Sequence, residues 1–337
     1  MINMHENRIF YYDFLRAFAI LAVVMCHIGF FFGSLDTLTK IIYHDSIHAI
    51  GLMGVPIFLM LTGALLLNKK ISLPKFFKRR FSRICFPFIF WVVIILASGF
   101  LIFNWNLEIA LRRFMGEASI LWYFWTLIGI YLFIPIINSF IREYQMKGLE
   151  YFLIIWFFTI LLKTFQLWPL FPPFEFNFNF ELNYFTDFIG FVILGYYLDN
   201  KDFKINSINM LIISCLTLII SIGLYDYLIL NHVYIGPVYQ NLINVFMAIG
   251  IFLFIKQLDK LNILEHMKDN LIGKLITSLS IYSYGIYFVH FIIYHYFMLF
   301  DFHSNKMIPI MIIIVLGISC GIIWILSKIP YINRVSY

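Results

Sequence analysis

The chain has 337 residues, of which 62% are hydrophobic and only 12% are charged, and its mean hydropathy is +0.88. A soluble domain is roughly 45–50% apolar and about 25% charged, so this composition excludes an ordinary soluble protein. The formal net charge of +6 lies mostly in one loop beside a predicted membrane span, which favours a topology signal over a nucleic-acid surface.

The apolar residues form repeated runs of about 17–25 residues, the length of helix that crosses a hydrocarbon layer of roughly 30 Å. Helices satisfy their own backbone hydrogen bonds in lipid, and the alternating strands of a membrane barrel are not seen. The sequence therefore predicts an all-α, polytopic bundle of about ten transmembrane helices in a single domain, residues 1–337. The first run has no cleavage site after it and is expected to be retained. The ten runs are 10–32, 47–67, 84–103, 120–137, 149–168, 184–198, 207–230, 239–255, 279–300 and 307–326.

The positive-inside rule sets the predicted orientation of these helices. The loop after the second run is strongly basic, whereas loops on the other side are neutral or acidic. Both termini are therefore predicted to be cytoplasmic. The loop at 256–277 mixes apolar and basic residues and is predicted to contain an interfacial amphipathic helix. The basic residues after the second run are Lys69, Lys70, Lys75, Lys78, Arg79, Arg80 and Arg83.

The first run carries ionisable residues, which are costly inside a spanning helix and are functional-site candidates by default. Asp13 and Arg16 are three residues apart, so they can pair on one face of the helix. His27 follows Arg16 by eleven residues, close to three helical turns, so both project from one stripe with His27 about 16 Å deeper. The structural alternatives are an interfacial ion pair and a histidine hydrogen-bonded between two helices.

Two further groups of residues are candidates for a site. Ser283, Tyr287 and His290 share a face of the ninth run, where they either line a cavity or bridge helices. Arg80 and Arg83 lie at the cytoplasmic end of the third run, and a guanidinium can hold a phosphate in a forked geometry. The positive-inside rule alone also places basic residues there. No metal-ligand cluster, phosphate-binding glycine loop or nucleotide fingerprint occurs, so no metal site is expected.

Six short segments, in order, resemble signatures of the membrane acyltransferase 3 family, and the resemblance covers essentially the whole chain. The chain most resembles the stand-alone branch, in particular the O-acetyltransferases that modify bacterial surface polysaccharides such as enterobacterial common antigen. Thr62 stands where the family more usually has serine, a change that keeps the hydroxyl. The segments are Asp13-x-Leu15-Arg16-x-x-Ala19 with His27, residues 54–63, residues 80–87, residues 121–125 with Tyr131 and Pro135, residues 194–196 and residues 283–290.

This resemblance implies transfer of an acyl group from cytoplasmic acyl-CoA, usually acetyl-CoA, to a hydroxyl of a cell-surface or lipid-linked carbohydrate. The implied location is a bacterial-type cytoplasmic (plasma) membrane, with the donor as a substrate and no permanently bound cofactor. His27 is the expected catalytic base or a transient acyl carrier, because a neutral imidazole can take the proton of a hydroxyl. Asp13 and Arg16 are expected to position either the donor or the first helix at the cytoplasmic mouth of the site, and Arg80 and Arg83 are expected to hold the CoA phosphates.

Two other classes of function stay open. A transporter or flippase of a lipid-linked glycan would also need buried charges, but it would need discontinuous helices around a midplane site, and residues 54–63 with Pro56 are the only hint of one. A non-catalytic membrane scaffold predicts that changes to Arg16 and His27 are neutral. Candidate contacts for an acceptor sugar on the predicted outer side are Glu175, Glu181 and Asp187.

Overall fold

The computed structural model of the chain describes residues 8–29, 47–70, 72–115, 121–166, 185, 187–231, 239–298, 308–330 and 332–335. Within these ranges the regular structure is helical, as the sequence predicts, and no strand occurs. The helices are α1 (Phe10–Gly29), α3 (Ile47–Leu52), α4 (Gly54–Leu66), α5 (Leu73–Leu101), α6 (Leu107–Phe114), α7 (Trp122–Gln166), α9 (Ile189–Asn200), α10 (Ser207–Leu230), α11 (Leu242–Lys260), α12 (Glu265–Lys268), α13 (Leu271–Met298) and α14 (Ile308–Lys328), followed by the 3-10 turn η4 (Ile332–Val335).

Among the described residues, eight helical segments are long and apolar enough to cross a membrane, and the predicted polytopic bundle is confirmed. Helices α3 and α4 together form one of these segments. Helix α7 spans two of the predicted runs, 120–137 and 149–168, and its backbone leaves the helical region at Gln145 (φ 51°, ψ −139°). The sixth run, 184–198, corresponds to α9, whose 12 residues reach about 18 Å and are too short to cross alone. The cytoplasmic position of the termini stays a prediction.

Three predicted boundaries are wrong for a common reason, which is that helices continue through polar turns that an apolar pattern does not register. Helix α5 begins at Leu73 rather than at residue 84, so most of the basic residues assigned to a loop lie on a helix started by Ser72 and Pro74. Helix α13 begins at Leu271 rather than at 279, where the Asn270 side chain accepts a hydrogen bond from the Gly273 amide at 3.0 Å. Because α11 ends at Lys260 and α13 begins at Leu271, the loop predicted at 256–277 is shorter, and the helix inside it is the four-residue α12.

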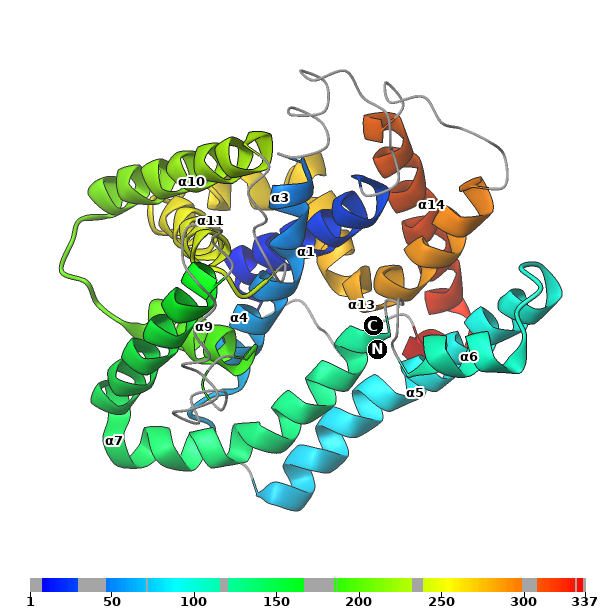
Figure 1. The fold of residues 1–337 in the computed structure, drawn as a ribbon, viewed down its shortest axis with the longest axis horizontal. Coiled ribbons are helices and arrows are strands. Elements are labelled where there is room, and N and C mark those ends of the chain that lie inside the picture. Colours follow the sequence, from blue (N-terminus) through cyan, green and yellow to red (C-terminus); the bar gives the residue numbers. More distant parts are fainter. Residues whose placement is uncertain are drawn as a thin grey trace.

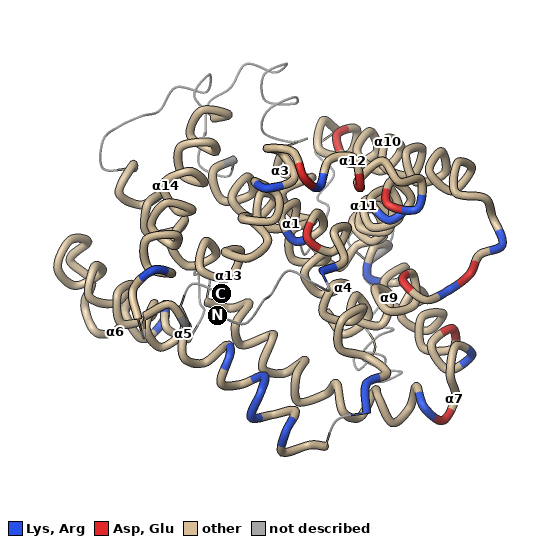
Figure 2. The backbone as a smooth tube through the Cα atoms, turned by 180° about the vertical axis from the view of Figure 1, so that it is seen from behind, with Lys and Arg blue, Asp and Glu red and all other residues tan. Residues whose placement is uncertain are grey.

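Helix α1 lies in the middle of the fold and packs against α13, α3, α4, α14 and α11 (Figure 1). Helix α4 packs along α9, and α10 packs along α11. Helices α10 and α14 lie at the edge and bury only 17% and 28% of their apolar windows inside the bundle, as expected of helices that face lipid. Lys and Arg follow one another along the first half of α5, whereas α14 is almost free of charge (Figure 2).

Helices α4 and α9 cross with their backbones almost in contact, and two glycines make this approach possible. A Cβ atom at Gly63 would lie 1.7 Å from the carbonyl oxygen of Val192, and one at Gly195 would lie 2.1 Å from the carbonyl oxygen of Met60. Small residues at such crossings allow van der Waals contact and drive helix association in membranes. The crossing therefore fixes the position of α4, which carries part of the cavity described below.

We expect Gly63→Ala and Gly195→Ala to destabilise the fold, because the added methyl group meets backbone that cannot move aside. The expected loss is about 1–3 kcal/mol or more in the free energy of unfolding. The measurement is thermal unfolding of the purified protein in detergent. Gly317→Ala is the matched control, because a Cβ atom there would meet no atom within 4 Å. Equal stability of the two crossing variants and the control would contradict the close contact.

Candidate active site

Helix α1 presents Asp13, Arg16 and His27 on one uninterrupted helix, with Asp13 near its first turn and His27 in its last. Eleven residues separate Arg16 from His27, a rise of about 16 Å. The two groups therefore belong to two regions, one at each end of α1.

The Asp13 carboxylate is buried, 4% exposed, and forms the centre of a polar cluster between α1 and α13. It accepts hydrogen bonds from Arg8 Nε at 2.9 Å and from the Ser280 hydroxyl at 2.6 Å, and a second Arg8 nitrogen also contacts it. Arg16 lies 3.8 Å from the same carboxylate and donates to Ser280 Oγ at 3.2 Å. The predicted Asp13–Arg16 pair is thus present, but Arg8 is the closer partner.

Three arginines converge beside this cluster. Arg16 from α1 and Arg80 and Arg83 from α5 all lie close enough to the Tyr131 hydroxyl of α7 to interact with it electrostatically. Neither Arg80 nor Arg83 donates a hydrogen bond to another residue in the part of the chain that the structure describes. Three guanidinium groups around one phenol form a strongly positive region that can accept an anion.

A row of tyrosines connects the arginines to the histidines. Tyr131 interacts electrostatically with Tyr284 and Tyr123, and Tyr287 in turn interacts with both of these. The rings of Tyr123 and Tyr287 are 5.8 Å apart, and the Tyr284 hydroxyl donates to the Ile84 carbonyl oxygen at 3.0 Å. We call Tyr131, Tyr284, Tyr123 and Tyr287 the tyrosine row. It is a series of phenol groups in an otherwise apolar part of the bundle.

The far end of the row meets a pair of histidines, His27 of α1 and His290 of α13, whose ring centroids are 5.1 Å apart. His27 Nδ1 lies 2.7 Å from the Val23 carbonyl oxygen, and His290 Nδ1 lies 2.9 Å from that of Ile286. A carbonyl oxygen can only accept, so each Nδ1 donates and each neutral ring keeps a free lone pair on Nε2. His290 is fully buried, and its Nε2 has no partner among the described residues.

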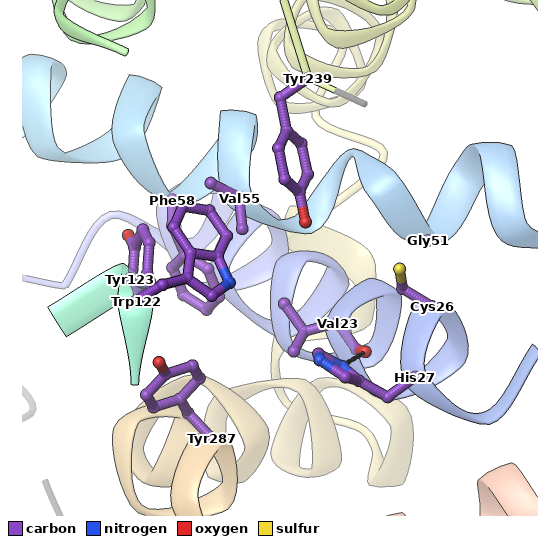
Figure 3. A pocket seen from close by; sticks show the side chains of 10 residues that line it. All are labelled: Val23, Cys26, His27, Gly51, Val55, Phe58, Trp122, Tyr123, Tyr239 and Tyr287. Atoms are coloured by element: carbon purple, nitrogen blue, oxygen red, sulfur yellow. Dashed lines mark hydrogen bonds between the residues drawn. The ribbon is translucent and has the colours of Figure 1, made fainter. Parts of the chain in front are cut away.

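His27 lines a small cavity of about 20 Å³ together with aromatic side chains from α4, α7, α13 and the turn before α11 (Figure 3). Tyr239 and Tyr287 point toward the cavity from opposite sides, and Trp122 covers a third side of it. This volume holds about one water molecule, so the cavity is nearly closed in this conformation. Its lining residues are Val23, Cys26, His27, Gly51, Val55, Phe58, Trp122, Tyr123, Tyr239 and Tyr287.

Polar and aromatic side chains cover the cavity on the side away from Arg16. The rings of Trp122, Phe188 and Tyr239 lie 5.5–5.9 Å apart. Beside them, the Gln240 side chain donates to Asp187 at 2.9 Å. Asp187, a predicted acceptor contact, therefore lies near the cavity, whereas Glu175 and Glu181 lie outside the described residues.

The predicted site residues thus fall into two groups. The structure brings His27 and Tyr287 together at the cavity, and His290 packs against the His27 ring without lining the cavity itself. It brings Arg16, Arg80 and Arg83 together around Tyr131. Ser283 donates to the Ser280 carbonyl oxygen at 3.0 Å and is not among the residues that line the cavity.

Sequence reasoning missed four residues of these regions. Arg8 and Ser280 are partners of Asp13, and the only signal for Ser280 was its place one turn before Ser283 on the same helix face. Tyr239 carries no signal in the sequence, because tyrosines at membrane interfaces are common. Tyr284 lies in the segment 283–290 that resembles the family, but nothing in the sequence distinguishes it from its neighbours there.

The fold and these two regions define a class of protein, a polytopic membrane protein in which a row of tyrosines connects a pair of histidines to a group of arginines. The chain belongs to the acyltransferase 3 family, whose model, described as an acyltransferase domain, matches residues 9–328. Membership of this family supports membrane acyltransferase activity. No curated protein and no solved structure matches the chain.

We expect Asp13→Asn to lower the free energy of unfolding by about 2–3 kcal/mol, because Arg8 and Arg16 then lose a buried counter-charge. Thermal unfolding in detergent measures the effect. Glu108→Gln is the control: its ion pair with Arg112 (3.1 Å) is exposed, and its loss should cost less than about 0.5 kcal/mol. If the two substitutions had equal effects, the Asp13 cluster would not be a buried charge centre.

Proposed function

We propose that the protein transfers an acyl group, with acetyl as the expected one, from cytoplasmic acyl-CoA to a hydroxyl of a cell-surface or lipid-linked carbohydrate. The membrane is proposed to be a bacterial-type cytoplasmic membrane. The observation that carries this proposal is His27 at a cavity, in ring contact with the buried His290, within a chain that belongs to an acyltransferase family. The donor, the acceptor and the O-linked product are parts of the proposal.

The orientation of the histidines suits proton transfer. With Nδ1 donating to the Val23 carbonyl oxygen, His27 is held as the tautomer that exposes a basic Nε2. In the proposed reaction this nitrogen takes the proton of the acceptor hydroxyl while the hydroxyl oxygen attacks the thioester carbonyl carbon. The carbon–sulfur bond breaks, and the imidazolium returns the proton to the CoA thiolate. The products are an ester and CoA thiol.

The three arginines supply the proposed site for the donor. CoA carries several phosphates and is confined to the cytoplasm, so a cluster of guanidinium groups at the predicted cytoplasmic end can hold it. The thioester arm would then follow the tyrosine row toward His27. Because the cavity has only about 20 Å³, the aromatic side chains around it must move when the acyl group enters.

Transport of a glycan is the second candidate, since α3 and α4 form a span that is interrupted at Met53 beside the cavity. Packing accounts for this interruption. Cβ atoms at Gly51 and Gly54 would lie 2.7 Å from backbone atoms of α1, so the two short helices are shaped by close contact with α1. An acyltransferase function therefore accounts for more of the site than a glycan transporter does.

We expect His27→Ala to reduce acyl transfer from acetyl-CoA by about 10²–10⁴-fold, the usual contribution of a general base. The assay is release of CoA thiol by purified protein in the presence of membrane glycans, together with analysis of ester-linked acetyl groups on those glycans. His295→Ala is the control, because His295 is one to two turns further along α13 and does not line the cavity. Undiminished transfer by a well-folded His27→Ala variant would refute catalysis at this site and favour transport.

A further inference from the structure

A second cavity, of about 450 Å³, lies between the end of α4, the start of α5 and the middle of α7. We call it the basic cavity. Lys69 and Arg142 supply two positive charges, and Ser72, Asn138 and Ser139 supply further polar groups. The rest of the wall is apolar and includes Leu66, Leu73, Phe76, Pro135 and Ile136. Its size is that of a site for a small organic ligand, and its charge suits an anion.

The wall of the basic cavity is held in place by Asn138, which is buried. Its side-chain oxygen accepts a hydrogen bond from the Asn68 amide at 2.6 Å, at a residue with a positive φ of 58°. This bond fixes the turn that carries Lys69 against α7. On the same helix, Arg142 donates to Ser139 Oγ at 3.0 Å. The two positive charges are therefore borne by elements that hydrogen bonds position in advance, as preorganised binding requires.

On both α5 and α7, residues of the basic cavity lie one helical turn from the region of the three arginines. On α5, Phe76 in its wall is one turn before Arg80, and on α7, Pro135 is one turn after Tyr131. Figures 1 and 2 both show α5 and the first half of α7 running side by side. Groups along this pair of helices thus follow the order basic cavity, Tyr131 with its arginines, Tyr123 and the small cavity with His27.

The spacing of these groups along α7 matches the dimensions of CoA. From Tyr123, at the small cavity, the helical rise is about 12 Å to Tyr131 and about 18 Å to Pro135. The pantetheine arm, about 14 bonds from the diphosphate to the sulfur, extends to roughly 17 Å at the spacing of an extended chain. A thioester at His27 therefore places the diphosphate near Arg80 and Tyr131. Asn138 and Arg142 are about 22–28 Å from Tyr123 along α7. They therefore lie beyond the diphosphate, where the adenosine of CoA would follow.

We propose that the basic cavity binds the adenosine 3′-phosphate of the acyl-CoA donor, with Lys69 and Arg142 as its counter-charges. This inference rests on the proposed function, because it assigns the far end of the same donor. A phosphate monoester carries close to two negative charges near neutral pH, which two cations balance. A phospholipid headgroup, usually a diester, shares the phosphate chemistry but carries one negative charge at its phosphate.

The first test compares acetyl-CoA with 3′-dephospho-acetyl-CoA, which lacks only the group in question. For the unaltered protein, KM for the dephospho donor should be about tenfold or more above that for acetyl-CoA, the usual effect of a charge-assisted hydrogen bond. Arg142→Ala should lower this ratio by raising KM for acetyl-CoA, because Lys69 is then the only counter-charge of the 3′-phosphate in the cavity. Lys147→Ala, which removes a charge from α7 outside the cavity, should keep the ratio. The same ratio in the Arg142→Ala and unaltered proteins would overturn the proposal.

The second test measures binding and does not require turnover. The full-length protein in phosphatidylcholine nanodiscs is titrated calorimetrically with adenosine 3′,5′-bisphosphate and with adenosine 5′-monophosphate. Preference for the bisphosphate that is lost in Arg142→Ala supports the assignment, and equal binding of the two nucleotides overturns it. Stabilisation by phosphatidylglycerol that depends on Arg142, with no nucleotide preference, would assign the cavity to lipid instead. If acetyl-CoA gives no transfer at all, the proposed function fails while this titration still decides the role of the cavity.

Discussion

The buried Asp13 carboxylate is the interaction on which the relative placement of α1 and α13 depends. A charge inside a membrane bundle must be paired, and Arg8, Arg16 and Ser280 provide the partners. Arg16 meets Ser280 at one end of the two helices, and His27 meets His290 at the other. The separation is eleven residues on α1 and ten on α13, so both contacts form in one register only. A shift of one turn would separate the histidines and unpair the charges together.

A second charge centre holds the same end of α1 against α9 and α11. Lys256, which is buried, donates to the Leu198 carbonyl oxygen at 2.9 Å and also contacts Asp199. The Asp199 carboxylate accepts hydrogen bonds from Tyr12 at 2.8 Å and from Tyr11. Helix α1 is thus anchored on two sides at its charged end, whereas at its other end it contacts aromatic side chains around a cavity. Rigidity at one end and adaptable packing at the other suit a site whose aromatic walls must move.

The long apolar runs were enough to predict a bundle of membrane helices. The α1 part of the candidate site could also be predicted, because one helix of known pitch carries Asp13, Arg16 and His27. Helical geometry alone aligns such residues. It also placed Tyr287 and His290 on one face of α13. Helical geometry does not predict contacts between helices. Only the structure shows that Arg8 and Ser280 are the partners of Asp13 and that Tyr239 lines the cavity. The start of α5 was missed because a helix that leaves the lipid can continue through charged residues.

The position of α1 has a consequence for how the protein is made. Helix α1 is synthesised first, but Ser280 follows Asp13 by 267 residues. At a synthesis rate of about 5–20 residues per second, that partner emerges roughly 13–53 s later. Arg8 can pair with Asp13 at once, yet Arg16 must wait for α13 before its hydrogen bond forms. Of the described helices, α1 is therefore made early and completed late, and a chain that stops before α13 leaves Arg16 and His27 of this central helix without Ser280 and His290.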